Sequence, residues 1–308
     1  MIITVTPNPA FDKTLQVNGF EIGEHLRAKV LGCIPAGKGI NVSRGLFRLG
    51  RDSTAGALIG RNDRAGFESV LRHENIQPLL VSVDGVTRTN TTIMDTVSST
   101  TTHIREEGPE VSTQEFAELA GRLERTIAAA HKSVRIVITG SLPPGVEKGP
   151  FTELLKACGE AGARIYCDTS GRPFRWAVES GRVDVVTPNV KELGEYLGND
   201  IDTSQVPEAA STLFPAVSRV IVTGGKRGAW VVDDDRVIHA AADLPEEKVR
   251  NTVGCGDAFL AGWLAARSRE MGREKSLRWA VAAGTACAMG ESAVDYERSR
   301  VETILRRV

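Results

Sequence analysis

The chain has 308 residues, of which 41% are hydrophobic and 25% are charged, and its formal net charge is −1. This composition is that of an ordinary globular protein with enough chain to bury a large core. The balanced charge argues against a nucleic-acid-binding protein, and no apolar run approaches the ~18 residues of a membrane helix. Five scattered cysteines without a CxxC pair favour reduced thiols in a cytoplasmic protein over disulfides or a zinc site.

Short β-branched segments alternate with helical segments along the chain. Because each late strand is followed by a helix, the pattern is typical of a parallel sheet covered on both faces. We therefore expect one α/β domain over residues 1–308. The expected strands cover residues 2–6, 54–59, 135–139, 164–168, 183–187 and 220–223. The expected helices cover residues 39–49, 66–74, 113–130, 150–160, 191–197, 206–213, 257–268 and 275–289.

Residues 12–34 and approximately 86–106 interrupt this alternation. The second segment is rich in Thr and Val and partly alternates, which predicts a half-exposed antiparallel strand pair. A small flap of this kind would act as a lid if it covered the carboxyl ends of the parallel strands, where open α/β sheets bind ligands. The alternative is a surface ribbon for dimer contact, and the two are compatible because exposed strands pair readily. We expect a homodimer joined through the lid strands.

A glycine-rich loop precedes the helix expected at residue 39. It resembles a P-loop, but Gly39 stands where that motif needs a hydroxyl for Mg²⁺, so the P-loop interpretation fails. Glycines at 37 and 39 would let the backbone approach a ligand closely, and Lys38 and Asn41 add a cation and an amide. A tight turn with a solvated lysine explains the same residues, and the loop alone does not distinguish the two.

The segment Gly254-Cys255-Gly256-Asp257 opens a long helix of small residues. Two glycines around one small residue form a concave row of N–H donors, which together with the helix dipole suits an anion. An ordinary helix start would also explain Asp257, but it does not require both glycines. We therefore favour an anion site, and we expect Asp257 to stay ionised at the positive end of the helix.

Two further loops follow expected strands. Residues 222–228 form a glycine-rich turn that would suit either a phosphate or a hairpin. Asn189 and Glu192 are three residues apart at a helix start, which suits one helix face near a ligand or an ordinary capping box.

Eight segments together resemble the ribokinase-like (PfkB) sugar kinases, more closely the branch that contains 1-phosphofructokinase and tagatose-6-phosphate kinase. The resemblance runs over nearly the whole chain, and the segments occur in the order found in that family. They are TPNPAFD at 6–12, AGKGINVSRGL at 36–46, TRTN at 87–90, GSLPPG at 140–145, DTSG at 168–171, TPNVKEL at 187–193, VTGGKRG at 222–228 and NTVGCGDAFLAG at 251–262.

The resemblance implies a three-layer α/β sandwich with a mostly parallel sheet and a β-sheet lid. It also implies ATP, Mg²⁺ and phosphoryl transfer to the hydroxyl of a hexose phosphate. By position, Asp257 would be the general base, and the amides of Gly254, Cys255 and Gly256 would form the anion hole. The implied substrate-binding residues are Asp12, Gly37, Lys38, Gly39, Asn41, Arg88, Asn90, Arg105 and Ser141. The implied nucleotide-binding residues are Asn189, Glu192, Thr223, Gly225 and Gly228, with Asn189 and Glu192 holding Mg²⁺ through water or phosphate.

The acceptor implied first is fructose 1-phosphate, which would give fructose 1,6-bisphosphate. Tagatose 6-phosphate, fructose 6-phosphate and a free sugar or nucleoside are the alternatives. Lys38, Arg88 and Arg105 favour a phosphorylated sugar, because a second phosphate needs cations. Cys255 replaces the usual alanine of the family, a change that leaves the backbone donors in place and predicts sensitivity to alkylation.

Two other classes of protein fit less well. A dinucleotide-binding dehydrogenase would carry GxGxxG after the first strand, where this chain reads Thr-Pro-Asn-Pro. A catalytically inactive sugar-binding regulator would have lost Asp257 or its glycines, and all of these are present.

Overall fold

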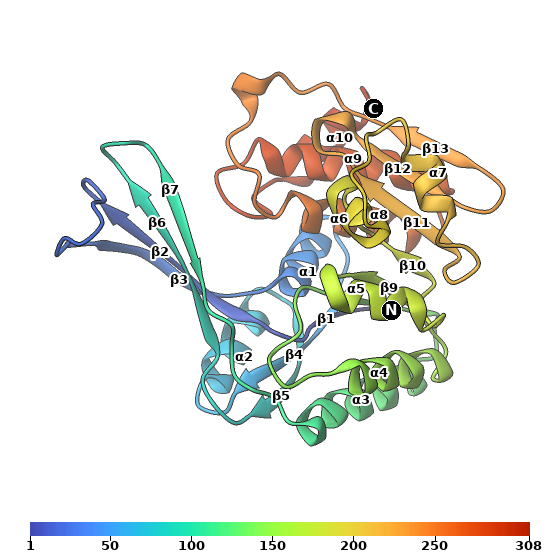
Figure 1. Ribbon diagram of the computed structural model, residues 1–308, viewed down its shortest axis with the longest axis horizontal. Coiled ribbons are helices and arrows are strands. Elements are labelled where there is room, and N and C mark those ends of the chain that lie inside the picture. The colour runs from blue at the N-terminus through green and yellow to red at the C-terminus, as the bar shows by residue number, and fades with distance from the viewer.

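A nine-stranded, mostly parallel sheet forms the body of the protein in a computed structural model that describes residues 1–308 (Figure 1). Seven strands run parallel, and β12 and β13 form an antiparallel edge beside β11. In spatial order the strands are β13 (Val237–Ala240), β12 (Ala229–Val232), β11 (Arg219–Thr223), β10 (Val185–Val186), β9 (Ala163–Asp168), β8 (Val134–Thr139), β1 (Ile2–Thr6), β4 (Thr54–Gly60) and β5 (Gln77–Val83).

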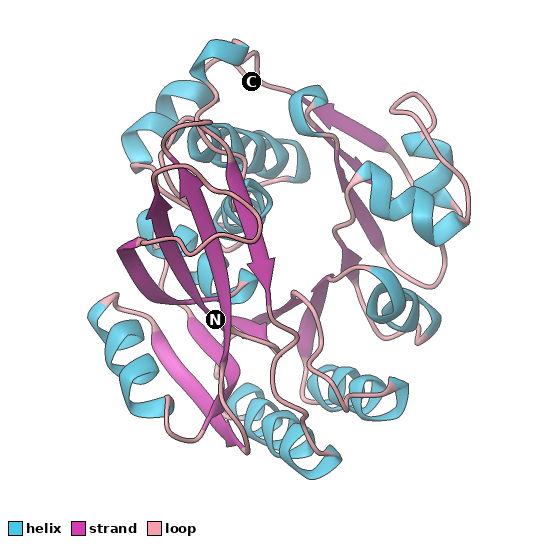
Figure 2. Cartoon of the chain, turned by 60° about the vertical axis from the view of Figure 1, so that its left-hand side comes forward, coloured by secondary structure: helices cyan, strands magenta, loops and turns pink.

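Helices cover both faces of this sheet, as Figure 2 shows. Successive side chains of β8 point to opposite faces of the sheet, and both faces are apolar. Ile136 and Ile138 belong to the hydrophobic cluster on one face, and Val137 belongs to the cluster on the opposite face. The first cluster includes buried residues of α3 (Thr113–Ala128), α4 (Lys148–Glu160), α5 (Gly171–Glu179), α6 (Val190–Leu197) and α7 (Val206–Ser211). The second includes residues of α1 (Lys38–Arg48), α8 (Cys255–Arg267), α9 (Arg273–Ala288) and α10 (Arg298–Leu305), while α2 (Arg64–His73) packs in a third, smaller cluster.

A separate four-stranded sheet projects from the body (Figure 1). Its order is β3 (Lys29–Ala36), β2 (Ala10–Val17), β6 (Arg88–Asp95) and β7 (Thr101–Arg105). The antiparallel pair expected within residues 86–106 is β6 with β7. The sequence did not indicate that β2 would join β6 in parallel, which makes one sheet from two distant segments.

Several elements differ from the expected ones. The strand expected over 183–187 has only two ladder residues, Val185 and Val186. Helix α5 was missed because Gly171 and Pro173 suggest a loop, yet both lie in its first turn, where proline is tolerated. Strand β5, strand β13 and helix α10 were also missed. None of the helices is both long enough and apolar enough to cross a membrane.

Candidate active site

The carboxyl ends of the central parallel strands converge on Asp168, the last residue of β9. Thr139, at the end of β8, donates its hydroxyl to Oδ2 of Asp168 at 2.7 Å, and the Thr187 hydroxyl donates to Oδ1 at 3.0 Å. The ammonium of Lys38 lies 3.4 Å from Oδ2. Asp168 therefore fixes two loops and one cation at the sheet edge where α/β proteins bind ligands. Sequence reasoning missed this role, although Asp168 belongs to one of the eight segments.

Lys38 sits in the first turn of α1 beside three carboxylates. The charge of Asp168 raises the pKa of Lys38, and Asp257 and Glu192 act in the same direction while burial opposes them. The ammonium is therefore permanently charged at the centre of the site. The lysine is paired with Asp168, but its side chain remains 46% exposed, so it is also solvated.

The glycines on either side of Lys38 are required by the end of β1. Gly37 has φ +144°, and a Cβ there would lie 2.5 Å from the methyl of Thr6. A Cβ on Gly39 would lie 2.6 Å from the Thr6 hydroxyl oxygen. Because neither position has room for a side chain, the start of α1 packs directly on the strand end and holds Lys38 there.

The N-terminus of α8 presents unpaired backbone amides. Gly254 is the N-cap with φ +78°, and no side chain caps the helix. The first hydrogen bond of the helix runs from the Ala258 amide to the Gly254 carbonyl at 2.8 Å, so the amides of residues 255–257 have no partner within the helix. A Cβ built on Gly256 meets nothing within 4 Å, so the space beside this turn is open.

Asp257 lies in this first turn and is only 6% exposed. Its Oδ2 accepts a hydrogen bond from the Asn41 side-chain amide at 2.9 Å. Burial raises the pKa of Asp257 to about 7, against the opposing effects of Asn41 and Lys38. Burial therefore acts against the expectation that Asp257 stays ionised, which stays a prediction. A carboxyl group with a pKa near 7 is well suited to accept a proton.

Asn41 connects α1 to this carboxylate. Its side-chain oxygen accepts a hydrogen bond from Arg44 at 3.4 Å, which orients the NH₂ group toward Asp257. Arg44 is held in turn by Glu74 at 2.9 Å. The structure thus places Asn41, expected among the substrate-binding residues, directly against Asp257.

Two further expected residues meet on one face of the small sheet. Asp12 of β2 and Asn90 of β6 are partners in the parallel register, and the Asn90 side-chain amide donates to Asp12 Oδ1 at 3.0 Å. Arg105 of β7 lies opposite Asn90 in the antiparallel register. This face therefore carries a carboxylate, an amide and a guanidinium, which suits a polyhydroxylated and anionic ligand.

Arg88 stands where β6 leaves the body. Its guanidinium donates to the carbonyls of Asn8 at 2.8 Å and Glu106 at 3.1 Å, and Nη2 lies 3.5 Å from the Ser141 hydroxyl. Burial lowers the pKa of Arg88, and the nearby charge of Arg105 acts in the same direction. The structure therefore brings Arg88, Arg105 and Ser141 into one cationic region beside Asn90.

Asn189 and Glu192 form a complete capping box at the start of α6. The Glu192 amide donates to Asn189 Oδ1 at 2.9 Å, and the Asn189 amide donates to Glu192 Oε2 at 2.9 Å. Burial raises the pKa of Glu192, and the charge of Lys38 acts against this. Glu192 thus has a structural role, in which one of its two carboxylate oxygens accepts from the Asn189 amide.

Thr223, Gly225 and Gly228 belong to the hairpin from β11 to β12. Thr223 forms an isolated parallel bridge with Asn189, and Gly225 starts a short 3-10 turn that ends before Gly228. The hairpin alternative for this glycine cluster is therefore correct in conformation. No hydrogen bond joins these three residues to Lys38, Asp168 or Asp257.

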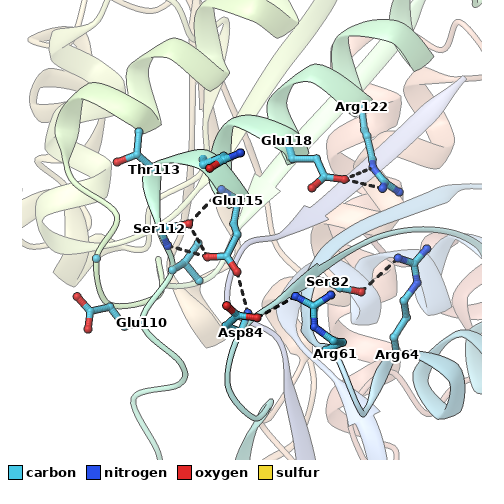
Figure 3. A pocket seen from close by; sticks show the side chains of 13 residues that line it. Arg61, Arg64, Ser82, Asp84, Glu110, Ser112, Thr113, Glu115, Glu118 and Arg122 are labelled. Carbon is cyan, nitrogen blue, oxygen red and sulfur yellow. Dashed lines mark hydrogen bonds and ion pairs between the residues drawn. The ribbon is translucent and has the colours of Figure 1, made fainter.

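The protein carries a second, unrelated hollow of about 890 Å³ on its surface (Figure 3). Its cations are paired within the hollow: Arg61 with Asp84 at 2.8 Å, and Arg122 with Glu118 at 2.6 Å. Because these charges satisfy one another, we assign no ligand to it. No group of three or more His, Cys, Asp or Glu side chains is arranged to hold a metal ion.

The family model described as pfkB family carbohydrate kinase matches residues 6–296. The chain belongs to the pfkB family of carbohydrate kinases. A member of this family transfers a phosphoryl group to a sugar hydroxyl, and the family implies ATP as the donor.

Individual relatives of this kinase cover nearly its whole length. It is 31% identical to a 1-phosphofructokinase of Bacillus subtilis, over 94% of this chain and 93% of that protein. A structure of Escherichia coli phosphofructokinase-2 in complex with fructose-6-phosphate superposes with a TM-score of 0.88 at 26% identity, covering 99% of this chain and 98% of that one. An Arabidopsis thaliana ribokinase with ribose and ATP, at 19% identity and a TM-score of 0.77 over 99% and 98% of the two chains, shows the same ribokinase-like fold.

Proposed function

We propose that this kinase phosphorylates a hexose phosphate, with fructose 1-phosphate as its first acceptor and MgATP as its donor. The observation that carries the proposal is the cationic region of Arg88, Arg105 and Ser141 next to Asp12 and Asn90. A free sugar needs hydroxyl partners only, whereas an acceptor with its own phosphate needs cations within reach. The named 1-phosphofructokinase relative supports the same acceptor.

In the proposed reaction, Asp257 accepts the proton of the attacking sugar hydroxyl. Its pKa of about 7 lets it hold that proton without a large penalty, and Asn41 keeps its carboxylate aligned. The amides of Gly254, Cys255 and Gly256 donate to the oxygens of the transferring phosphoryl group. These donors are fixed before the reaction, so they stabilise charge in a loose transition state without reorganising.

Glu192 is the proposed contact with the donor phosphates, and Lys38, expected among the substrate-binding residues, is proposed to contact the acceptor. Lys38 supplies a charge that Asp168 holds in place. Mg²⁺ favours oxygen ligands and keeps several waters, so a single carboxylate such as Glu192 fits it through water or phosphate. When bound, the ion would neutralise charge on the phosphates. Asn189 and Thr223, joined by their bridge, are proposed beside the nucleotide with Gly225 and Gly228.

Fructose 6-phosphate and tagatose 6-phosphate are the competing acceptors. The similarity to a phosphofructokinase-2 solved with fructose-6-phosphate favours the first of these. The two fructose phosphates carry their phosphate at opposite ends of the sugar. They therefore differ in which end of the molecule must lie against Arg88.

A panel of acceptors with MgATP, read out as ADP release, tests the proposal. We expect the highest kcat/KM with fructose 1-phosphate, lower values with the two 6-phosphates, and very low turnover with fructose, ribose and nucleosides. Arg88→Ala is expected to raise KM for the phosphorylated sugar far more than for the free sugar. Arg61→Ala, in the unrelated hollow, is the matched control and should leave KM unchanged for both the phosphorylated and the free sugar. Sugar binding without any ADP release would favour an inactive regulator.

The second face of the small sheet supports a homodimer. Register places Leu15, Ile93 and Val30 in one row across three strands, with Ile104 on the same face of β7. Val30 and Ile104 are 57% and 53% exposed, so an apolar surface stays uncovered in one copy. Because the polar residues Asp12 and Asn90 occupy the opposite face, a partner copy could pack here without blocking them.

Light scattering after size-exclusion chromatography tests this assembly. We expect the wild type to be a dimer and Ile104→Lys to be a folded monomer. Val237→Lys, on an exposed position of β13, should stay dimeric. Escherichia coli phosphofructokinase-2 has been solved in a tetrameric inhibited form, so a larger assembly that Ile104→Lys does not disrupt would count against this surface.

A further inference from the structure

Two of the five cysteines meet at the N-terminus of α8. Cys255 is the first residue of α8, and Cys287 lies in the last turn of α9 and is fully buried. Gly284 precedes Cys287 by three residues and so shares its helix face. A Cβ built on Gly284 would lie 3.3 Å from the Cys255 carbonyl oxygen. The two helices therefore approach closely at these two side chains.

The two thiols lie against one loop. The sulfur of Cys255 lies 3.6 Å from the Asn251 carbonyl, and that of Cys287 lies 3.7 Å from the Val253 carbonyl, two residues further along. Each thiol affects the other, since Cys287 raises the pKa of Cys255 and Cys255 lowers the pKa of Cys287. Cys255 is the one that solvent partly reaches.

The remaining cysteines lack such a partner. Cys33 is exposed on β3, Cys158 is buried in α4, and Cys167 is buried in β9 beside the Thr169 hydroxyl. None of them contacts another cysteine. A paired thiol is therefore a particular property of the turn that carries Gly254, Gly256 and Asp257.

We propose that Cys255 and Cys287 are a modification site: a hydroperoxide oxidises them to a reversible disulfide that stops phosphoryl transfer. This consequence for activity rests on the proposed role of the α8 amides. The Cys255 thiol, which solvent partly reaches, attacks the peroxide and gives its proton to the departing oxygen; the O–O bond breaks, and an alcohol or water leaves with a sulfenic acid formed on Cys255. The Cys287 thiolate then attacks that sulfur, the S–O bond breaks and water leaves. Two thiols lose two protons and two electrons, and the peroxide takes them up.

The disulfide would deform the turn because of its short bond. An S–S bond of about 2.05 Å is much shorter than any contact between thiols, so Cys255 must move toward α9. The turn has little room to follow as one body, because Gly254 packs so closely against Ala293 that an added Cβ would lie 2.9 Å from the Ala293 Cβ. The Cys255 amide would thus be displaced from its neighbours at Gly254 and Gly256. A cross-link at this point would remove the alignment of the donors while leaving the fold intact.

Peroxide titration of the full-length, reduced kinase tests the proposal. Peptide mapping after alkylation should reveal a Cys255–Cys287 cross-link, formed in parallel with the loss of ADP release. A small dithiol should reverse both. Cys287→Ser should keep the basal activity, form no cross-link and resist peroxide at doses that inactivate the wild type. Cys158→Ser, which changes a buried thiol without a partner, should behave as the wild type does.

Two outcomes would overturn the proposal. One is the absence of the cross-link at peroxide doses that fully oxidise the exposed Cys33. The other is a quantitative cross-link with unchanged turnover. If the reduced wild type phosphorylates no sugar of the acceptor panel, the proposed function fails. Peptide mapping then still decides whether the thiols pair.

Discussion

The side-chain amide of Asn41 donates a hydrogen bond of 2.9 Å to the carboxylate of Asp257, and this joins α1 to the first turn of α8 across more than 200 residues of sequence. Asn41 is the one side chain that donates a hydrogen bond to this carboxylate. It stabilises the ionised form of Asp257 against the burial that disfavours it. Removing this amide should therefore change how the kinase responds to pH.

Asn41→Ala is expected to move the acidic limb of kcat/KM to higher pH. The proton acceptor works only when ionised, so activity of the wild type should fall as pH drops through about 7. Without the amide, the pKa of Asp257 rises and the limb follows it. Steady-state rates across pH 5.5–9 measure the shift, and Arg61→Ala is the control. An unmoved limb would mean that another group controls it.

Asp257→Asn should abolish most of the turnover and leave the fold intact. Loss of a general base typically costs 10²–10⁴-fold in rate, and we expect a loss within that range, ~10² or more, in kcat. Asparagine has nearly the same shape, so Asn41 still finds an oxygen to bind. Circular dichroism and sugar binding should match the wild type. Turnover within a few-fold of the wild type would remove Asp257 from the mechanism.

The same variant should be more stable than the wild type at high pH. The pKa of Asp257 is raised from 3.8 to about 7 on folding, so between these values the folded chain binds more protons than the unfolded one. Its contribution to stability thus falls as pH rises through this window. Asparagine is uncharged at every pH, so burying it does not carry the free-energy cost of burying an ionised carboxylate. Thermal unfolding at pH 5 and pH 8 should show a larger gain for Asp257→Asn at pH 8, and equal gains would contradict the burial argument.

Alanine at the two glycines of the α8 turn should separate stability from catalysis. Gly254→Ala places a Cβ at φ +78° and 2.9 Å from Ala293, so it should lower stability by about 1–3 kcal/mol. Gly256→Ala meets open space and should unfold like the wild type. Its methyl would nevertheless occupy the room beside the amides and reduce kcat. A destabilised but fully active Gly256→Ala would reverse this assignment.

Asp168→Asn should leave Lys38 without its main charge partner. The asparagine oxygen can accept from one of the two hydroxyls, Thr139 or Thr187, and its NH₂ group can donate to the other, so the loops stay in place while the charge is lost. We expect a lower pKa for Lys38 and a loss of about tenfold or more in kcat, because the cation is no longer held by a charged hydrogen bond. Thr139→Val, which removes one hydrogen bond but keeps the charge, should have the smaller effect on kcat.

The sequence was informative where the residues of a site are adjacent in the chain. It was uninformative where their properties depend on burial or on contacts made by the fold. The α8 turn could be predicted because Gly254, Gly256 and Asp257 are adjacent and need no fold to meet. Asp168 could not be recognised as the centre of a network, because Thr139 and Thr187 reach it only when three strands end together. The raised pKa of Asp257 could not be foreseen for the same reason. A helix start is visible in sequence, but the burial of its first turn is not.

The placement of Arg88 has a mechanical consequence. Its guanidinium binds the carbonyls of Asn8 and Glu106, which lie on two of the four connections between the projecting sheet and the body. An acceptor phosphate that binds these N–H groups must compete with those carbonyls. Binding of the acceptor would therefore weaken the hydrogen bonds that hold the projecting sheet to the body. Arg88 would then both bind the substrate and allow the projecting sheet to move relative to the body.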